Sequence, residues 1–182
     1  MYFRDLKCVL GQELMPEAAL LRLPIRIGSR DPETAIVRPV SKRLEQRGLA
    51  RTDGWQVWTE GEGEVRGVEL ALILAQPTRA GLLAVADALR LAPIGSSVRF
   101  RDGGDPVVFG GCEAVEVSLP PVDPANSRIA ARCSEVLGRK GQVRGWSVGQ
   151  SSTKLYVYGP EAEAIVSDLR PVLGDVPIRP RS

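Results

Sequence analysis

The chain of 182 residues contains no histidine and only three cysteines. Without histidine there is no imidazole general base, no Ser-His or Cys-His nucleophile pair and no histidine metal ligand, which excludes the commonest hydrolase sites. Cys8, Cys112 and Cys133 are odd in number, widely spaced and outside any Cys-x-x-Cys motif, so they predict neither a zinc site nor a disulfide framework. We therefore expect reduced thiols in the cytoplasm, no cofactor, no metal and no enzymatic activity.

The sequence also lacks a large excess of one charge sign, and it lacks a long apolar run. Lys and Arg total 24 against 22 Asp and Glu, for a net charge of +2, whereas a protein held mainly by phosphate contacts carries a clear basic excess. The composition therefore does not favour a nucleic-acid partner. No apolar run approaches the roughly 18 residues of a membrane span, and Asp5 and Lys7 interrupt the first ten residues. We expect neither a signal peptide nor a membrane anchor.

The first half of the chain alternates strand and helix patterns. Residues 20–27 alternate apolar and polar side chains in their later half, which predicts a strand, and Pro24 places that strand at a sheet edge. Asp31-Pro32-Glu33 predicts the start of a helix, in which Pro39 implies a kink or a later beginning. The order β-α-β-β-α-β is completed by a hairpin of residues 55–59 and 68–74, a helix opened by Thr78 and a strand at 97–100.

The second half repeats this order after residues 101–106, which have the composition of a linker. Asp123-Pro124 repeats the helix opening of the first half. The other expected elements are strands at 113–119, 143–148, 154–158 and 176–178 and a helix opened by Pro160. We therefore predict an α+β protein of two tandem ferredoxin-like (β-α-β-β-α-β) units, residues 1–105 with an N-terminal extension and residues 106–182, whose antiparallel sheets pack together edge to edge or through their uncovered faces.

Aromatic residues make up only 5% of the chain, so the position of each is informative. Alternation along the first hairpin places Trp55 and Trp58 on opposite faces, so one tryptophan should lie outside the helix-covered core. In the second hairpin Tyr156 and Tyr158 should occupy the open face of the sheet. Packing between the two units is the favoured role for them. The alternative is a nucleic-acid-binding module that stacks bases on this face, with candidate residues Arg144, Lys154, Tyr156 and Tyr158.

The loop Glu60-Gly61-Glu62-Gly63-Glu64 joins the two strands of the first hairpin and carries three glutamates. Such a loop is most simply a flexible, solvated turn. It could also present an acidic finger to a basic partner protein, because complementary charges guide and orient protein association.

Several phrases of the sequence are similar to those of a bacterial protein family. They are Leu44 to Gly48, Gly54-Trp55, Val68 to Leu74, Leu89-x-x-x-Pro93-x-Gly95-Ser96 and Leu155-Tyr156-Val157-Tyr158-Gly159-Pro160-Glu161-Ala162. With them the chain resembles small proteins encoded beside polymorphic or secreted toxins, some of which are immunity proteins. Where those relatives often carry Gly-Gly-Gly after the first helix, this chain has Asp53-Gly54-Trp55.

The resemblance implies a non-enzymatic immunity or antitoxin-type protein that binds a cognate bacterial toxin and occludes its active site. The expected contact residues are Trp58, Glu60, Glu62 and Glu64. A small-molecule sensor with its ligand between the two halves is a further alternative. The oligomeric state is left open by the sequence.

Overall fold

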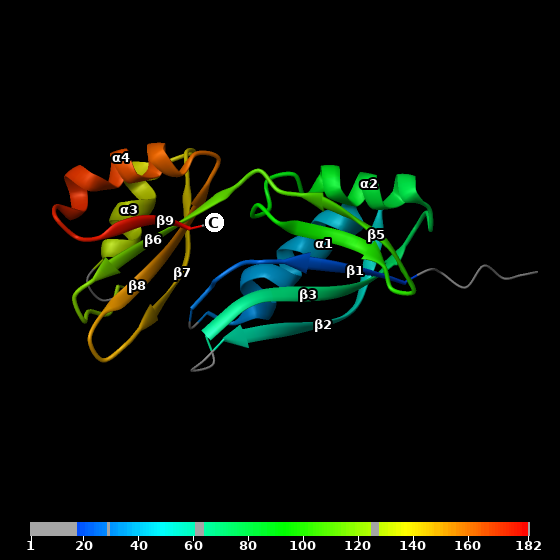
Figure 1. Ribbon diagram of the computed structural model, residues 1–182, viewed down its shortest axis with the longest axis horizontal. Helices are drawn as coiled ribbons and strands as arrows, with labels where there is room; N and C mark the ends of the chain where they lie inside the picture. Colours follow the sequence, from blue (N-terminus) through cyan, green and yellow to red (C-terminus); the bar gives the residue numbers. More distant parts are fainter. Residues whose placement is uncertain (1–17, 29, 61–63, 125–127, 182) are drawn as a thin grey trace, which may run out of the picture.

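Two antiparallel sheets, each accompanied by a pair of helices, lie end to end along the long axis of the molecule (Figure 1). The computed structural model describes residues 18–28, 30–60, 64–124 and 128–181. The first unit consists of β1 (Ala18–Leu23), η1 (Glu33–Val37), α1 (Arg38–Gln46), β2 (Ala50–Glu60), β3 (Glu64–Leu74), α2 (Arg79–Ala88), β4 (Ser96–Phe100) and β5 (Gly103–Phe109). The second consists of β6 (Glu113–Leu119), α3 (Ile129–Leu137), β7 (Gln142–Val148), β8 (Thr153–Gly159), α4 (Ala162–Leu173) and β9 (Ile178–Arg181).

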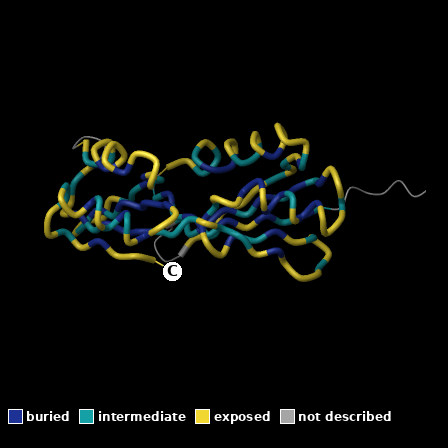
Figure 2. The backbone as a smooth tube through the Cα atoms, turned by 90° about the horizontal axis from the view of Figure 1, so that it is seen from above, coloured by how far each residue is buried: buried dark blue, intermediate teal, exposed yellow. Residues whose placement is uncertain are grey.

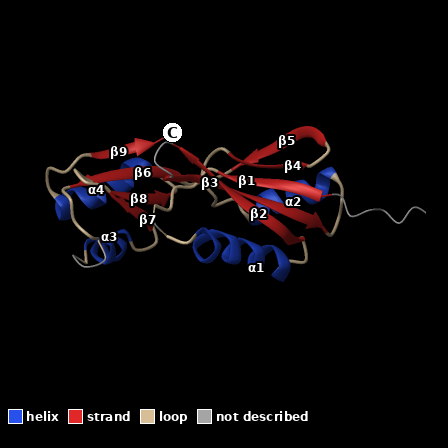
Figure 3. Cartoon of the chain, turned by 90° about the horizontal axis from the view of Figure 1, so that it is seen from below, coloured by secondary structure: helices blue, strands red, loops and turns tan. Residues whose placement is uncertain are grey.

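The strand orders confirm the predicted pair of ferredoxin-like units. The first sheet has the order β2-β3-β1-β4-β5 and the second the order β7-β8-β6-β9. In both, the first strand of the unit lies between its third and fourth strands, as the split β-α-β motif requires. Helices α1 and α2 pack on the first sheet, and α3 and α4 on the second (Figure 3). Each unit thereby forms its own apolar core.

Strand β1 is a central strand, so the predicted edge position of Pro24 is wrong. Residues Ala18 to Leu23 pair with β3 on one side, and the same strand pairs with β4 on the other. Pairing stops at Leu23 because Pro24 has no N–H to donate to a neighbouring strand. The proline therefore ends a buried strand, and Ile25 and Ile27 beyond it remain buried at the start of the connection to the first helix.

The first helical region shows how a helix that follows Asp31-Pro32 accommodates Pro39. The carboxylate of Asp31 accepts hydrogen bonds from the backbone N–H of Glu33 and of Thr34, as expected of a helix start. A π-helical turn, η1, then precedes Pro39, and the regular helix α1 begins only at Arg38. A proline near the first position of a regular α-helix is well tolerated. The regular α-helix thus begins later than Asp31-Pro32 indicates, while the helical backbone itself begins at Pro32 and continues through the π-helical turn.

The segment predicted as a linker is instead part of a hairpin. Arg101 and Asp102 form the turn between β4 and β5, and β5 pairs antiparallel with β4. The predicted unit boundary between residues 105 and 106 therefore falls inside β5, a strand that extends the first sheet beyond the basic motif. The actual connection is residues 110–112, which bond to the segment after α2 through the Cys112 N–H and the Ala92 carbonyl (3.1 Å).

Asp123-Pro124 does not mark the start of α3, contrary to the sequence prediction. Helix α3 begins only at Ile129, and the preceding residue, Arg128, has a left-handed backbone with φ of 56°.

The two units meet through close backbone contact and through side chains of the second sheet. Gly28, which follows β1, forms a parallel bridge with Trp146 of β7. A Cβ atom on Gly145 would lie 2.0 Å from the carbonyl oxygen of Ile27, so only glycine fits this approach. Figure 2 shows that buried segments continue along the strands of both units, with exposed residues mainly on loops and outer helix turns.

We predict that Gly145→Ala lowers the free energy of unfolding by about 1–3 kcal/mol, because the added methyl group collides with the fixed Ile27 carbonyl. Chemical denaturation measures the change. Gly54→Ala is the matched control, because no atom lies within 4 Å of a Cβ at that position. Equal stabilities of the two variants would show that the contact between Gly145 and Ile27 does not constrain the junction.

Candidate functional site

The hairpin of β2 and β3 carries the contact residues that the sequence suggested. Trp58 faces Gly67 across the hairpin, and its ring lies so close that a Cβ on Gly67 would come within 1.9 Å of it. The guanidinium carbon of Arg22 lies 4.5 Å from the ring centroid, within the range of a cation–π contact. Trp58 is therefore half-buried on the uncovered face, which confirms that one tryptophan leaves the helix-covered core.

The acidic turn is described only in part. Glu60 and Glu64 are backbone partners at the ends of β2 and β3. Glu62 lies outside the described residues. The hairpin thus brings Trp58 and the two flanking glutamate positions to the same end of the first sheet.

The most exposed aromatic residue of this hairpin is Trp55, on the face opposite Trp58. Trp55 and Val57 pair with the buried Leu70 and Val68, yet they are 41% and 36% exposed. No described strand pairs with the outer edge of β2. Alternation gives the face of a residue correctly, but it does not show how far the helices extend over that face.

A groove of about 500 Å³ lies between α1 and β2. The hydroxyls of Ser41 and Thr52, 2.6 Å apart, join the helix to the strand at one point. Beyond it the strand register shifts between Thr52 and Gly54. Trp55 lines the groove together with charged residues of both signs, among them Lys42 and Asp53.

The tyrosines of the second hairpin lie in the junction between the units. Tyr156 and Tyr158 are only 3% and 5% exposed, and both belong to the apolar cluster of the first unit. The backbone N–H of Arg26 donates to the Tyr158 hydroxyl at 2.8 Å. Packing between the units is confirmed as their role, and the two rings leave little of their surface exposed to solvent.

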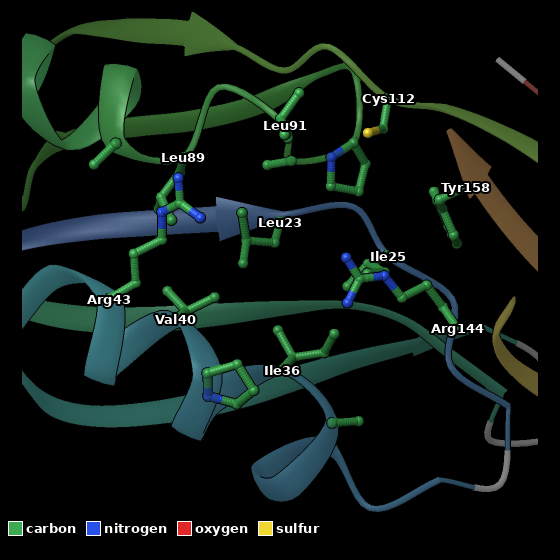
Figure 4. A pocket seen from close by; sticks show the side chains of 15 residues that line it. Leu23, Ile25, Ile36, Val40, Arg43, Leu89, Leu91, Cys112, Arg144 and Tyr158 are labelled. Carbon is green, nitrogen blue, oxygen red and sulfur yellow. The ribbon is translucent and has the colours of Figure 1, made fainter. Parts of the chain in front are cut away.

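The other two residues of the nucleic-acid alternative lie apart from each other. Lys154 is half-buried on β8, on the same face as Tyr156. Arg144 extends from β7 into a cavity between the units, where it lies near Tyr158 (Figure 4). The structure therefore brings Arg144 and Tyr158 together in an interior position and leaves Lys154 outside it.

A buried carboxylate in the junction was missed by sequence reasoning. The side chain of Glu116 is only 5% exposed. Its Oε1 accepts a hydrogen bond from Arg181 Nη2 at 3.0 Å, and its Oε2 lies 3.8 Å from Nη1 of Arg26. Alternation along residues 113–119 already places Glu116 opposite the core residues, and an acid in the middle of a central strand is a signal that a cationic partner is needed.

The cavity beside Arg144 has a volume of about 260 Å³ and is mainly apolar. Its walls come from the end of β1, helix α1, the end of α2 and the second unit (Figure 4). The residues that define it best are Leu23, Ile25, Val40, Leu89, Arg144 and Tyr158.

The two described thiols have the chemistry of ordinary cysteines, Cys112 partly buried and Cys133 buried. Burial raises the pKa of the Cys112 thiol, while the positive charge of Arg144 opposes that shift. Burial likewise raises the pKa of Cys133. Since the thiolate is the nucleophile, both groups are poorly reactive at neutral pH. The described residues contain no group of three or more His, Cys, Asp or Glu side chains that could hold a metal ion.

We predict that Tyr158→Phe lowers the free energy of unfolding by about 1–3 kcal/mol, because the half-buried Arg26 N–H loses its acceptor. Urea denaturation measures the loss. Tyr156→Phe is the matched control. Its hydroxyl lies 3.2 Å from Ser147 Oγ, a group that can rotate to another partner, so a smaller loss is expected. A larger effect of Tyr156→Phe would contradict this assignment.

We also predict a raised midpoint for the pH dependence of Cys112 alkylation. The folded protein should reach half of its maximal rate at a higher pH than the unfolded chain, because the folded pKa is raised by burial. Arg144→Met should move the midpoint further upward by removing the cation that favours the thiolate. Iodoacetamide labelling with peptide mass spectrometry measures both midpoints. A downward shift in the variant would contradict the proximity of Arg144.

Comparisons with known proteins give no family for this chain. No family model matches the sequence, and no curated protein matches it. The described residues contain no helix long and apolar enough to cross a membrane.

Several solved structures show a distant likeness to this chain. A protein from Bacteroides thetaiotaomicron is 11% identical, with 90% of this chain and 91% of that chain covered and a TM-score of 0.31. The ligand-free regulatory subunit of aspartate kinase from Thermus thermophilus is 16% identical, with 85% and 92% covered and a TM-score of 0.28. The first two RRM domains of the yeast poly(U) binding protein are 13% identical, with 90% and 97% covered and a TM-score of 0.25.

Proposed function

We propose that this chain is a non-enzymatic immunity or antitoxin-type protein, which binds a cognate bacterial toxin in the cytoplasm and occludes its active site. The hairpin of β2 and β3 is the contact surface. Trp55, Val57 and Trp58 supply its apolar contacts, and the turn with Glu60, Glu62 and Glu64 supplies its charge.

The observation that carries the proposal is the exposure of Trp55 and Val57 on an outer strand. They are 41% and 36% exposed on a strand whose outer edge pairs with no described strand. Tryptophan is strongly enriched among the residues that dominate binding energy in protein interfaces. An outer strand also offers backbone N–H and C=O groups to a partner. The outer side of β2 thus combines backbone hydrogen-bonding groups with a large apolar side chain.

The negative charge of the turn favours a partner with a basic surface. Three glutamates lie within five residues where β2 ends and β3 begins, so a basic surface on the toxin would be attracted to this end of the hairpin. Complementary charge of this kind mainly raises the association rate and orients the partner. Toxins that act on nucleic acids or phosphorylated substrates need basic active sites, and an acidic finger would cover such a site.

The chemistry of the remaining residues supports binding without catalysis. The chain has no histidine, and burial raises the pKa of both described thiols. The nucleic-acid alternative is less well supported, because Tyr156 and Tyr158 are buried between the units. The unpaired thiols Cys112 and Cys133 fit a reducing compartment such as the cytoplasm.

The proposal predicts a secreted toxin encoded beside this gene, and the test is binding of that toxin, measured by biolayer interferometry with purified proteins. Trp55→Ala combined with Val57→Ala should weaken binding by about 30-fold or more, the effect of removing a strong interface anchor. Leu83→Ala is the matched control, since Leu83 is 52% exposed on α2, away from the hairpin. An unchanged affinity of the double variant would reject β2 as the contact strand.

A second set of variants tests the acidic turn. Replacing Glu60, Glu62 and Glu64 by alanine should weaken capture by about tenfold, mostly through slower association and with a weaker dependence on salt. The control replaces an equal number of exposed glutamates of the second unit by alanine, at positions Glu135, Glu161 and Glu163. Equal association rates for the two triple variants would show that the glutamates of the turn do not attract the toxin.

A further inference from the structure

The cavity between the two units has an unusual distribution of charge. Its volume is about 260 Å³, and most of its lining is aliphatic. Arg43 and Arg144 are the charged residues among those that line it, and no acidic side chain joins them. Figure 4 shows the two arginines at opposite ends, with Leu23, Ile36 and Val40 between them.

Arg144 is the more constrained of the two cations. Its side chain is partly buried, and Figure 4 shows the guanidinium directed into the cavity beside Ile25. Within the described part of the chain, no carboxylate lies within 4.0 Å of this guanidinium, and no hydrogen bond from it is present. The second cation nearby, Arg30, donates to the Arg144 carbonyl at 3.1 Å and adds positive charge.

Physical chemistry makes such an arginine a strong anion receptor. A guanidinium stays protonated in proteins even when burial lowers its pKa, as it does for Arg144. A partly desolvated cation interacts more strongly with an anion than an exposed one does. The planar guanidinium also matches the geometry of a carboxylate through two parallel hydrogen bonds.

We propose that this cavity binds a small amphipathic carboxylate, with the carboxylate on Arg144 and the apolar body against Leu23, Ile25, Ile36, Val40 and Leu89. The volume sets the size of the ligand. An apolar cavity of about 150 Å³ holds benzene, and the same scale gives roughly ten heavy atoms here. Octanoate has this size and is the probe of choice. The site is separate from the hairpin of β2 and β3, so it neither requires nor excludes toxin binding.

The first experiment compares three eight-carbon probes on the unmodified protein by isothermal titration calorimetry at pH 7. Octanoate, 1-octanol and octylamine share the apolar chain and differ in charge. Octanoate should bind about tenfold or more tightly than 1-octanol, since a hydrogen bond to a charged group supplies that factor. Octylamine should bind more weakly than either. Equal affinities of octanoate and 1-octanol would overturn the proposal.

The second experiment locates the anion. Arg144→Met keeps the volume of the side chain and removes its charge, so the preference for octanoate over 1-octanol should be lost. Arg144→Lys should retain part of it. Arg43→Met is the matched control and should keep the full preference, because Arg43 is exposed at the other end. Loss of the preference in Arg43→Met, or its retention in Arg144→Met, would overturn the assignment.

A third experiment uses only the wild-type protein, so its result does not depend on whether a variant folds. Cys112 lines the same cavity, so saturating octanoate should slow its alkylation several-fold, as followed by peptide mass spectrometry. 1-Octanol at the same concentration should protect it less. Unchanged labelling of Cys112 under saturating octanoate would place the bound molecule elsewhere and overturn the proposal.

Discussion

The burial of two tyrosines of the second unit in the apolar cluster of the first is the interaction on which the rest of the structure depends. Tyr156 and Tyr158 point away from the core of their own unit, yet they are almost fully buried. The hydroxyl of Tyr158 is held by the backbone of the segment after β1. Because aromatic side chains bury large areas, this contact makes the two units one assembly with a defined relative position.

Both candidate sites follow from that position. The cavity at Arg144 exists because the second unit closes the space between α1 and the end of α2. The outer side of β2 remains accessible because the junction uses the segment after β1 and the open face of β8. A scaffold in which one region is rigidly closed and another is left accessible can present a binding surface without a large ordering cost.

Local features of the fold could be predicted from the sequence, because they depend on neighbours along the chain. Alternation predicted both hairpins, and Asp31 marked the first helix start. The predictions that were wrong concern residues whose role depends on distant segments. Pro24 ends a central strand because β3 and β4 flank it, and residues 103–106 form a strand because β4 offers a free edge.

The candidate site was predictable only in part for the same reason. The open-face position of Trp58 and the packing role of the tyrosines follow from alternation. The exposure of Trp55 does not, since it depends on how far the helices cover β2. The direction of Arg144 depends on a register shift between Val143 and Gly145 and on the approach of Ile27 to the latter. No pattern within β7 reveals either.

The sharing of the first core with Tyr156 and Tyr158 has a consequence for synthesis. A ribosome releases β1 to β5 well before it releases β8, so the newly made first unit has an uncovered apolar end until the second hairpin emerges. Exposed apolar surface during synthesis is a target for chaperones and a source of aggregation. A chain truncated before β8 should therefore aggregate or be bound by chaperones, and should not persist as a folded first unit.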